Sequence, residues 1–116
     1  MNRVLEGLKP AKVFRYFEDL TRIPHGSKNT KAISDYCVEF AKSRGLEYYQ
    51  DEMNNIVLIK EATEGYEDAP AVIVQGHLDM VCVKEENVEL DFMKDPLDLA
   101  VKGDYIYARG TSLRCV

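Results

Sequence analysis

The stretch AVIVQGHLDMV, residues 71–81, decides the fold of this chain. Its first four residues are apolar and three of them are β-branched, a pattern typical of a strand buried in a sheet. Because alternate residues of a strand point to the same side, His77 and Asp79 should leave its end on one face. A neutral imidazole is the commonest metal ligand, and a carboxylate binds the metal or orients the histidine. The stretch therefore predicts a core strand with a candidate metal site at its end.

Other interpretations of the histidines and of the nearby thiol stay open. A His-x-Asp sequence is short, and a histidine satisfied by an aspartate cap at a strand end would give the same pattern. His25 lies in a loop that could approach a substrate, although a loop histidine held by hydrogen bonds is the simpler interpretation. Cys82 follows the motif closely, and we expect it to be a buried structural thiol and not a metal ligand.

Composition indicates one ordinary globular unit. The 116 residues are 46% apolar and 30% charged, which is normal for a single domain. The 15 basic and 20 acidic residues give a net charge of −5, so a nucleic-acid partner is not favoured. No apolar run approaches the roughly 20 residues of a membrane helix. Three scattered cysteines without CxxC spacing favour free thiols in a reducing compartment, here the cytoplasm.

Helical and strand patterns alternate along the chain. Apolar spacing predicts a helix over residues 10–20 and a second one that begins after Asn29 or Thr30 and stops at Gly45. Strands are expected at residues 46–50 and 56–60, and a hairpin at residues 100–108 around Gly103. Together with the core strand, these elements predict an α/β fold.

Several motifs, taken in order, resemble the aminoacyl-histidine dipeptidases. These are cytosolic zinc dipeptidases of the aminoacylase, carnosinase and peptidase T superfamily. The resemblance runs from about Leu5 to Leu113, and its motifs are IPHGS at residues 23–27, NNIV at 54–57, GHLDMV at 76–81, DPL at 95–97 and GDYIYARGTSL at 103–113.

This resemblance implies a fold, a reaction and two site residues. Residues 1–116 would be the N-terminal portion of a three-layer α/β/α zinc-exopeptidase catalytic domain, incomplete and without its lid or dimerisation domain. The family hydrolyses dipeptides, especially those ending in histidine, with water activated by two zinc ions. His77 matches a zinc ligand of the family. Asp79 matches the catalytic aspartate that supports the histidine or the bridging ligand.

The chain departs from the family pattern after Leu113. Relatives continue with glycine, alanine and an aspartate that bridges the two zinc ions, whereas this chain has Arg114, Cys115 and Val116. The general-base glutamate and the later ligands are also missing. Because a catalytic zinc needs about three protein ligands and a water, we expect no stably bound zinc and no peptidase activity from this chain alone. The ending favours a truncated or frameshifted reading of a longer gene.

A different class of function stays open beside the enzyme. An unfinished sheet exposes a strand edge that pairs with other chains. The alternative is therefore a small non-catalytic protein that binds a partner through this edge, and the same edge favours self-association. A dipeptide would be the substrate of the full-length family, and neither nucleic acid nor membrane is expected as a partner.

Overall fold

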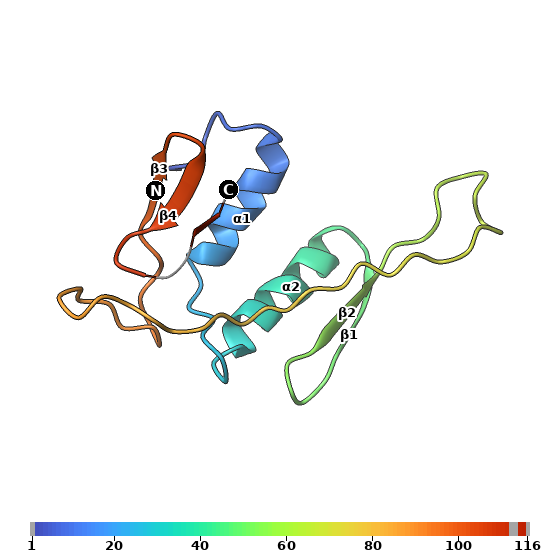
Figure 1. The fold of residues 1–116 in the computed structure, drawn as a ribbon. Coiled ribbons are helices and arrows are strands. Elements are labelled where there is room, and N and C mark those ends of the chain that lie inside the picture. The colour runs from blue at the N-terminus through green and yellow to red at the C-terminus, as the bar shows by residue number, and fades with distance from the viewer. Residues whose placement is uncertain (1, 112–113, 116) are drawn as a thin grey trace.

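The computed structural model describes residues 2–111 and 114–115. The helices are α1 (Ala11–Thr21) and α2 (Lys31–Ser43), and the strands are β1 (Glu47–Gln50), β2 (Ile56–Ile59), β3 (Leu99–Lys102), β4 (Tyr105–Ala108) and β5 (Arg114–Cys115). They form two small lobes, each with one helix against one sheet (Figure 1). The terminal lobe contains α1 and β3–β5, and the middle lobe contains α2, β1 and β2. The predicted α/β class is confirmed.

In the terminal lobe, residues from the beginning of the chain and residues from near its end pack around one apolar cluster. Leu5, Leu99, Ile106 and Ala108 are buried together, and Phe14 and Phe17 of α1 pack against them. β3 and β4 are the predicted hairpin, antiparallel around Gly103, whose φ of +59° suits a residue without a side chain. β5 adds to the other edge of β4. The cluster shows why a segment near residue 100 folds onto the first helix.

The middle lobe is a helix followed by a hairpin. α2 buries Ile33, Val38 and Ala41 and packs against β1 and β2, which are antiparallel neighbours. The predicted helix stop is confirmed, because Gly45 follows the helix with a φ of +64°. Thr30 takes the predicted N-cap position but makes no side-chain cap hydrogen bond.

The core strand predicted at residues 71–74 is wrong for this chain. Residues 70–76, called here the apolar arm, belong to no sheet, and the arm runs as the extended yellow trace in Figure 1. The side chains of Val72, Ile73 and Val74 are 86%, 89% and 95% exposed. A strand requires backbone hydrogen bonds to a neighbour, and no described part of the chain supplies one. Parallel pairing among the described residues is a single bridge between Gly26 and Met80.

The molecule is more open than its length requires. Its radius of gyration is 16.4 Å, whereas a compact domain of this length has about 13 Å. Its accessible surface is 9160 Å², compared with roughly 6,400 Å² for a folded chain of this mass. The large radius of gyration and the large accessible surface both follow from this architecture, in which the segment that connects the two lobes includes the uncovered apolar arm. No helix among the described residues is long and apolar enough to cross a bilayer.

Candidate site around His77 and Asp79

Two backbone hydrogen bonds fix the end of the His-x-Asp motif. The Met80 N–H donates to the His25 carbonyl at 3.0 Å, and the Ser27 N–H donates to the Met80 carbonyl at 3.1 Å. These bonds form the parallel bridge between Gly26 and Met80. The loop that follows α1 and the segment that follows the apolar arm therefore lie side by side, although about half of the chain separates them.

Asp79 lies between a histidine and a serine. Its Oδ1 is 2.9 Å from His77 Nδ1, and its Oδ2 accepts a hydrogen bond from Ser27 Oγ at 2.6 Å. The bond from Ser27, followed by the bond from His77, lowers the pKa of the Asp79 carboxyl from its usual value. An ionised carboxylate only accepts hydrogen bonds, so Nδ1 carries the ring proton. The lone pair of neutral His77 then belongs to Nε2, on a side chain that is 82% exposed.

This arrangement fits one ligand of a metal but does not fit a whole site. Metal-binding histidines commonly donate one ring N–H to a carboxylate and bind the metal with the other nitrogen, as the geometry of His77 allows. Among the described residues, however, no group of three or more His, Cys, Asp or Glu side chains could hold a metal ion. A catalytic zinc takes three protein ligands. The described chain therefore supplies at most one wall of such a site.

His25 and Cys82, the other two residues considered from the sequence, have different surroundings from the His77–Asp79 pair. His25 Nδ1 is 2.6 Å from the Ile23 carbonyl, so the ring is held within its own loop. The prediction that Cys82 is a buried thiol is wrong, because this side chain is exposed. Its sulfur lies against Gly26, where a Cβ would collide with it. The prediction assumed a closed core around the motif, and no described segment covers Cys82 from outside.

Ser27 is the residue that sequence reasoning missed. It belongs to the loop motif at residues 23–27, but nothing in the sequence relates it to Asp79, 52 residues away. The link becomes visible only when the Gly26–Met80 bridge brings the two segments together.

A separate hollow of about 420 Å³ lies between α1 and α2. The guanidinium of Arg44 lies 3.7 Å from the centre of the Phe40 ring and also covers Tyr16. Arg15, Asp19 and Glu39 also line the hollow. The side chains of His77 and Asp79 take no part in it, so it is not the site described above.

Comparison with known proteins shows similarity along nearly the whole chain. The chain is 37% identical over 109 residues to the cytosol non-specific dipeptidase of Escherichia coli K12, a match that covers 94% of this chain and 22% of that protein. Its structure matches the crystal structure of aminoacylhistidine dipeptidase from Vibrio alginolyticus with a TM-score of 0.87 and 33% identity, again over 94% and 22% of the two chains. No family model matches. The chain spans about a fifth of the length of these relatives.

Proposed function

The chain is a relative of the cytosolic and aminoacyl-histidine dipeptidases that corresponds to 22% of their length, and from this premise we propose that it carries one wall of a dipeptidase active site. Residues 1–116 would form part of a catalytic domain. The complete enzyme would hydrolyse dipeptides, including those ending in histidine, in the cytoplasm. Two zinc ions would supply the Lewis acid and the activated water.

The contact between Asp79, His77 and Ser27 is the observation that supports this proposal. A carboxylate that fixes the histidine tautomer is what a metal-binding imidazole requires, and both Asp79 oxygens are already used for hydrogen bonds at 2.9 and 2.6 Å. His77 would therefore be the zinc ligand of this chain. Asp79 would keep its ring in the correct orientation and protonation state, and Ser27 would hold Asp79.

The chain alone is expected to be inactive, because one imidazole does not make a catalytic zinc site. The test is dipeptide hydrolysis, with β-alanyl-histidine and an unrelated dipeptide as substrates, in the presence of added zinc. We expect no turnover above buffer and no zinc retained through gel filtration. Turnover that a chelator and His77→Ala both abolish would contradict this expectation, and so would stoichiometric zinc that His77→Ala removes.

A second candidate function is the binding of another protein, and the exposure of the apolar arm favours it. Val72, Ile73 and Val74 are almost fully exposed, and soluble chains rarely leave such a run uncovered. An unpaired extended segment of this kind accepts a further strand. In the absence of a partner, the arm should pair with the arm of a second copy.

A further inference from the structure

The hollow between α1 and α2 has acidic and basic side chains in its wall, and its carboxylates are already paired. The Asp19 carboxylate is 2.8 Å from the Arg3 guanidinium and 4.0 Å from the Arg22 guanidinium. The Glu39 carboxylate is 2.9 Å from the Lys42 ammonium. Both acidic groups of the wall therefore have basic partners that do not themselves line the hollow.

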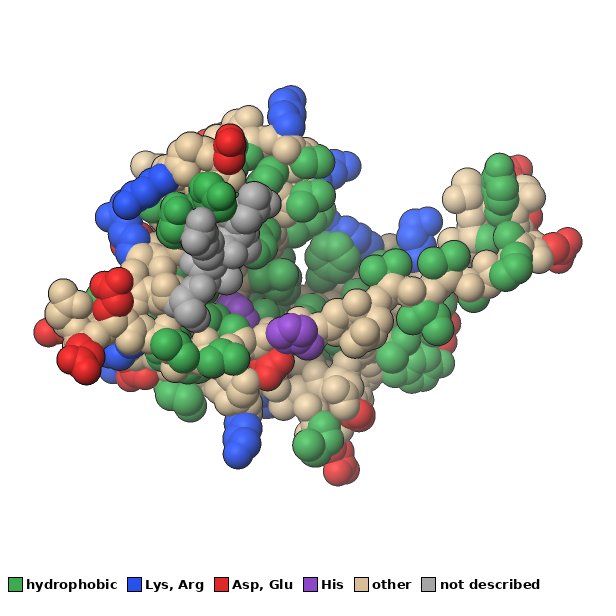
Figure 2. All heavy atoms as spheres, in the orientation of Figure 1, with side chains coloured by type: hydrophobic (Ala, Val, Ile, Leu, Met, Phe, Trp, Pro, Cys, Tyr) green, Lys and Arg blue, Asp and Glu red, His purple; other side chains and the backbone are tan. Residues whose placement is uncertain are grey.

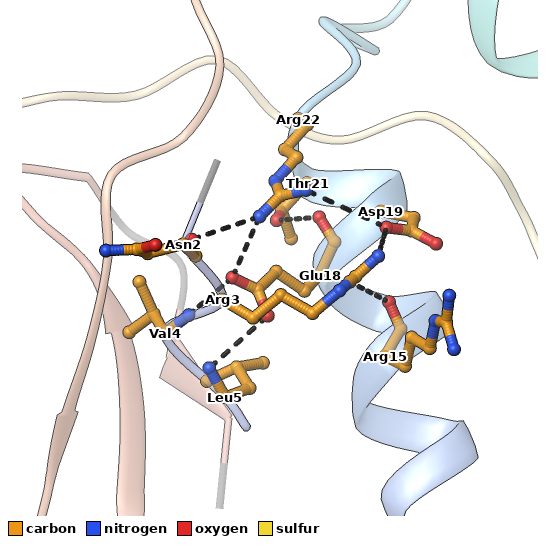
Figure 3. Close-up of polar contacts among 9 residues, drawn as sticks. All are labelled: Asn2, Arg3, Val4, Leu5, Arg15, Glu18, Asp19, Thr21 and Arg22. Atoms are coloured by element: carbon orange, nitrogen blue, oxygen red, sulfur yellow. Dashed lines mark hydrogen bonds and ion pairs between the residues drawn. The ribbon is translucent and has the colours of Figure 1, made fainter.

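Arg15 and Arg44, the two arginines that line the hollow, form no ion pair within the part of the chain that the structure describes. Figure 2 shows basic side chains over the end of α2, beside a gap that separates it from the lobe of α1. The bond that Arg3 makes to residue 15 goes to the backbone carbonyl, at 3.3 Å, and leaves the Arg15 guanidinium unused (Figure 3). In a protein with a net charge of −5, this hollow attracts negative charge locally.

The Arg44 side chain is held in one orientation by its neighbours. Its guanidinium lies 3.7 Å from the centre of the Phe40 ring, and it donates hydrogen bonds to the hydroxyls of Tyr16 and Ser43. The ring covers a face of the guanidinium, whereas the five N–H donors of an arginine lie in its plane. The N–H groups that these two bonds leave over stay available to a ligand. The Tyr16 hydroxyl accepts its bond and keeps its own hydrogen to donate.

We propose that this hollow binds a phosphate group, either of a small phosphomonoester or of the free ion. A phosphomonoester carries about −1.5 to −2 charges at pH 7 and three acceptor oxygens, which suits two guanidinium groups and one hydroxyl better than a singly charged carboxylate does. The volume of about 420 Å³ lies in the range of sites for small organic ligands, roughly 300–1,000 Å³. The hollow therefore has room for an organic group beside the phosphate.

The bound phosphate would connect Arg15 of α1 to Arg44 at the end of α2, and so link the two lobes. This inference does not rest on the proposed function, because the side chains of His77 and Asp79 take no part in the hollow.

The experiment titrates the dilute 116-residue chain with phenyl phosphate, inorganic phosphate or benzoate at pH 7.5, with the ionic strength held constant by sodium chloride. NMR follows the Nε–H resonances of the arginines. We expect those of Arg15 and Arg44 to shift saturably with phenyl phosphate and with one common half-saturation, at about 1 mM. Benzoate should bind at least about tenfold more weakly. Equal binding of inorganic phosphate would identify the free ion as the ligand, and tighter binding of phenyl phosphate would identify a phosphomonoester; both results support the proposal.

Arg15→Gln and Arg44→Gln should each weaken the binding of phenyl phosphate about tenfold, because each removes a charge-assisted hydrogen bond. Arg44 also holds two rings in place, so Arg15→Gln is the cleaner variant, since the Arg15 guanidinium bonds to no described residue. Lys12→Gln is the matched control. Lys12 is an exposed cation one turn earlier on α1 and does not line the hollow, so its loss should change the affinity less than about twofold.

Three results would overturn the proposal. The first is a set of shifts that rise linearly with phenyl phosphate or are matched by benzoate. The second is unchanged binding in Arg15→Gln. The third is an equal loss of binding in Lys12→Gln and Arg15→Gln, which would show a general attraction to the charge of α1 and not a site in the hollow.

Discussion

Glu18 shows how a single carboxylate holds a segment in place. Its side chain is almost fully buried, and it accepts hydrogen bonds from the backbone N–H groups of Val4 at 2.7 Å and Leu5 at 3.3 Å (Figure 3). Arg22, which caps the C-terminal end of α1 four residues after Glu18, neutralises it at 3.3 Å. These bonds tie the segment before α1 to the helix, and they deliver Leu5 into the apolar cluster of the terminal lobe.

We predict that Glu18→Ala lowers the free energy of unfolding of the terminal lobe by about 2–3 kcal/mol, because two backbone donors and one guanidinium lose a charged acceptor. Urea unfolding followed by circular dichroism measures this loss. Asp19→Ala is the matched control, since it removes only partly exposed ion pairs, with Arg3 and with Arg22, and should cost less than about 1 kcal/mol. Equal losses in the two variants would contradict the role of Glu18.

Asp51 organises the turn between β1 and β2. Its side chain accepts hydrogen bonds from the Asn55 side chain and from the backbone N–H groups of Asn55 and Met53, each at 2.9 Å. The side-chain bond from Asn55 comes first among the causes that lower the pKa of Asp51 from its usual 3.8. The folded pKa is therefore below the unfolded one.

Because of this direction, the contribution of Asp51 to stability should be fully present above pH 3.8 and should disappear as the pH falls below that value toward the folded pKa. The amide resonances of Met53 and Asn55 should report this loss in an acid titration by NMR. Asp51→Ala should abolish their titration. Glu52→Gln, in the same turn, should leave it intact, and a titration that follows Glu52 instead would refute the assignment.

At the scale of elements, the β3–β4 hairpin stays folded through its contact with α1. An isolated two-stranded hairpin is only marginally stable in water. Leu99 of β3 is 5% exposed and Ile106 of β4 is 8% exposed, and both lie in the cluster that Phe14 and Phe17 complete. The hairpin and the helix should therefore lose their structure together.

Leu99→Ala should destabilise the terminal lobe by about 2–4 kcal/mol, because it leaves a cavity between the hairpin and the helix. Amide exchange in α1 and β4 should accelerate together, while exchange in α2 and β1 should not change. Val101→Ala provides the control, since Val101 lies two residues along the same strand but is 39% exposed, and its loss should cost less than about 1 kcal/mol. Acceleration confined to β3 would contradict the coupling of the hairpin to α1.

At the scale of the whole molecule, the chain consists of two lobes and an uncovered arm. The apolar cluster of the terminal lobe and the buried face of α2 are separate, and a surface of 9160 Å² leaves much apolar area in water. Cooperative unfolding requires a shared core, which the described residues do not form.

We therefore predict that the chain alone melts in a broad transition and self-associates as its concentration rises. Thermal melting beside analytical ultracentrifugation tests both expectations. Ile73→Lys should reduce the self-association without changing the melting of the lobes, since residue 73 contacts neither of them closely. A monomer with one sharp, reversible transition above about 60 °C, near the upper end for ordinary domains, would show that the fold is self-sufficient.

The sequence by itself determined the features that depend on near neighbours. Apolar spacing located both helices. Gly45 marked the end of the second helix and Gly103 marked the hairpin turn, and both have positive φ values in the structure. The two-residue spacing of His77 and Asp79 brought their side chains together. These features depend on interactions within a few residues, so periodicity and turn chemistry are sufficient to predict them.

Only the tertiary structure decided what each segment meets across long sequence distances. It joined Ser27 to Asp79 and Glu18 to Leu5, exposed Cys82, and left residues 71–74 without a sheet. The apolar pattern of these four residues shows that they are suited to a core strand. Whether a suited segment becomes a strand depends on backbone partners and apolar cover from elsewhere, and the described part of this chain provides neither.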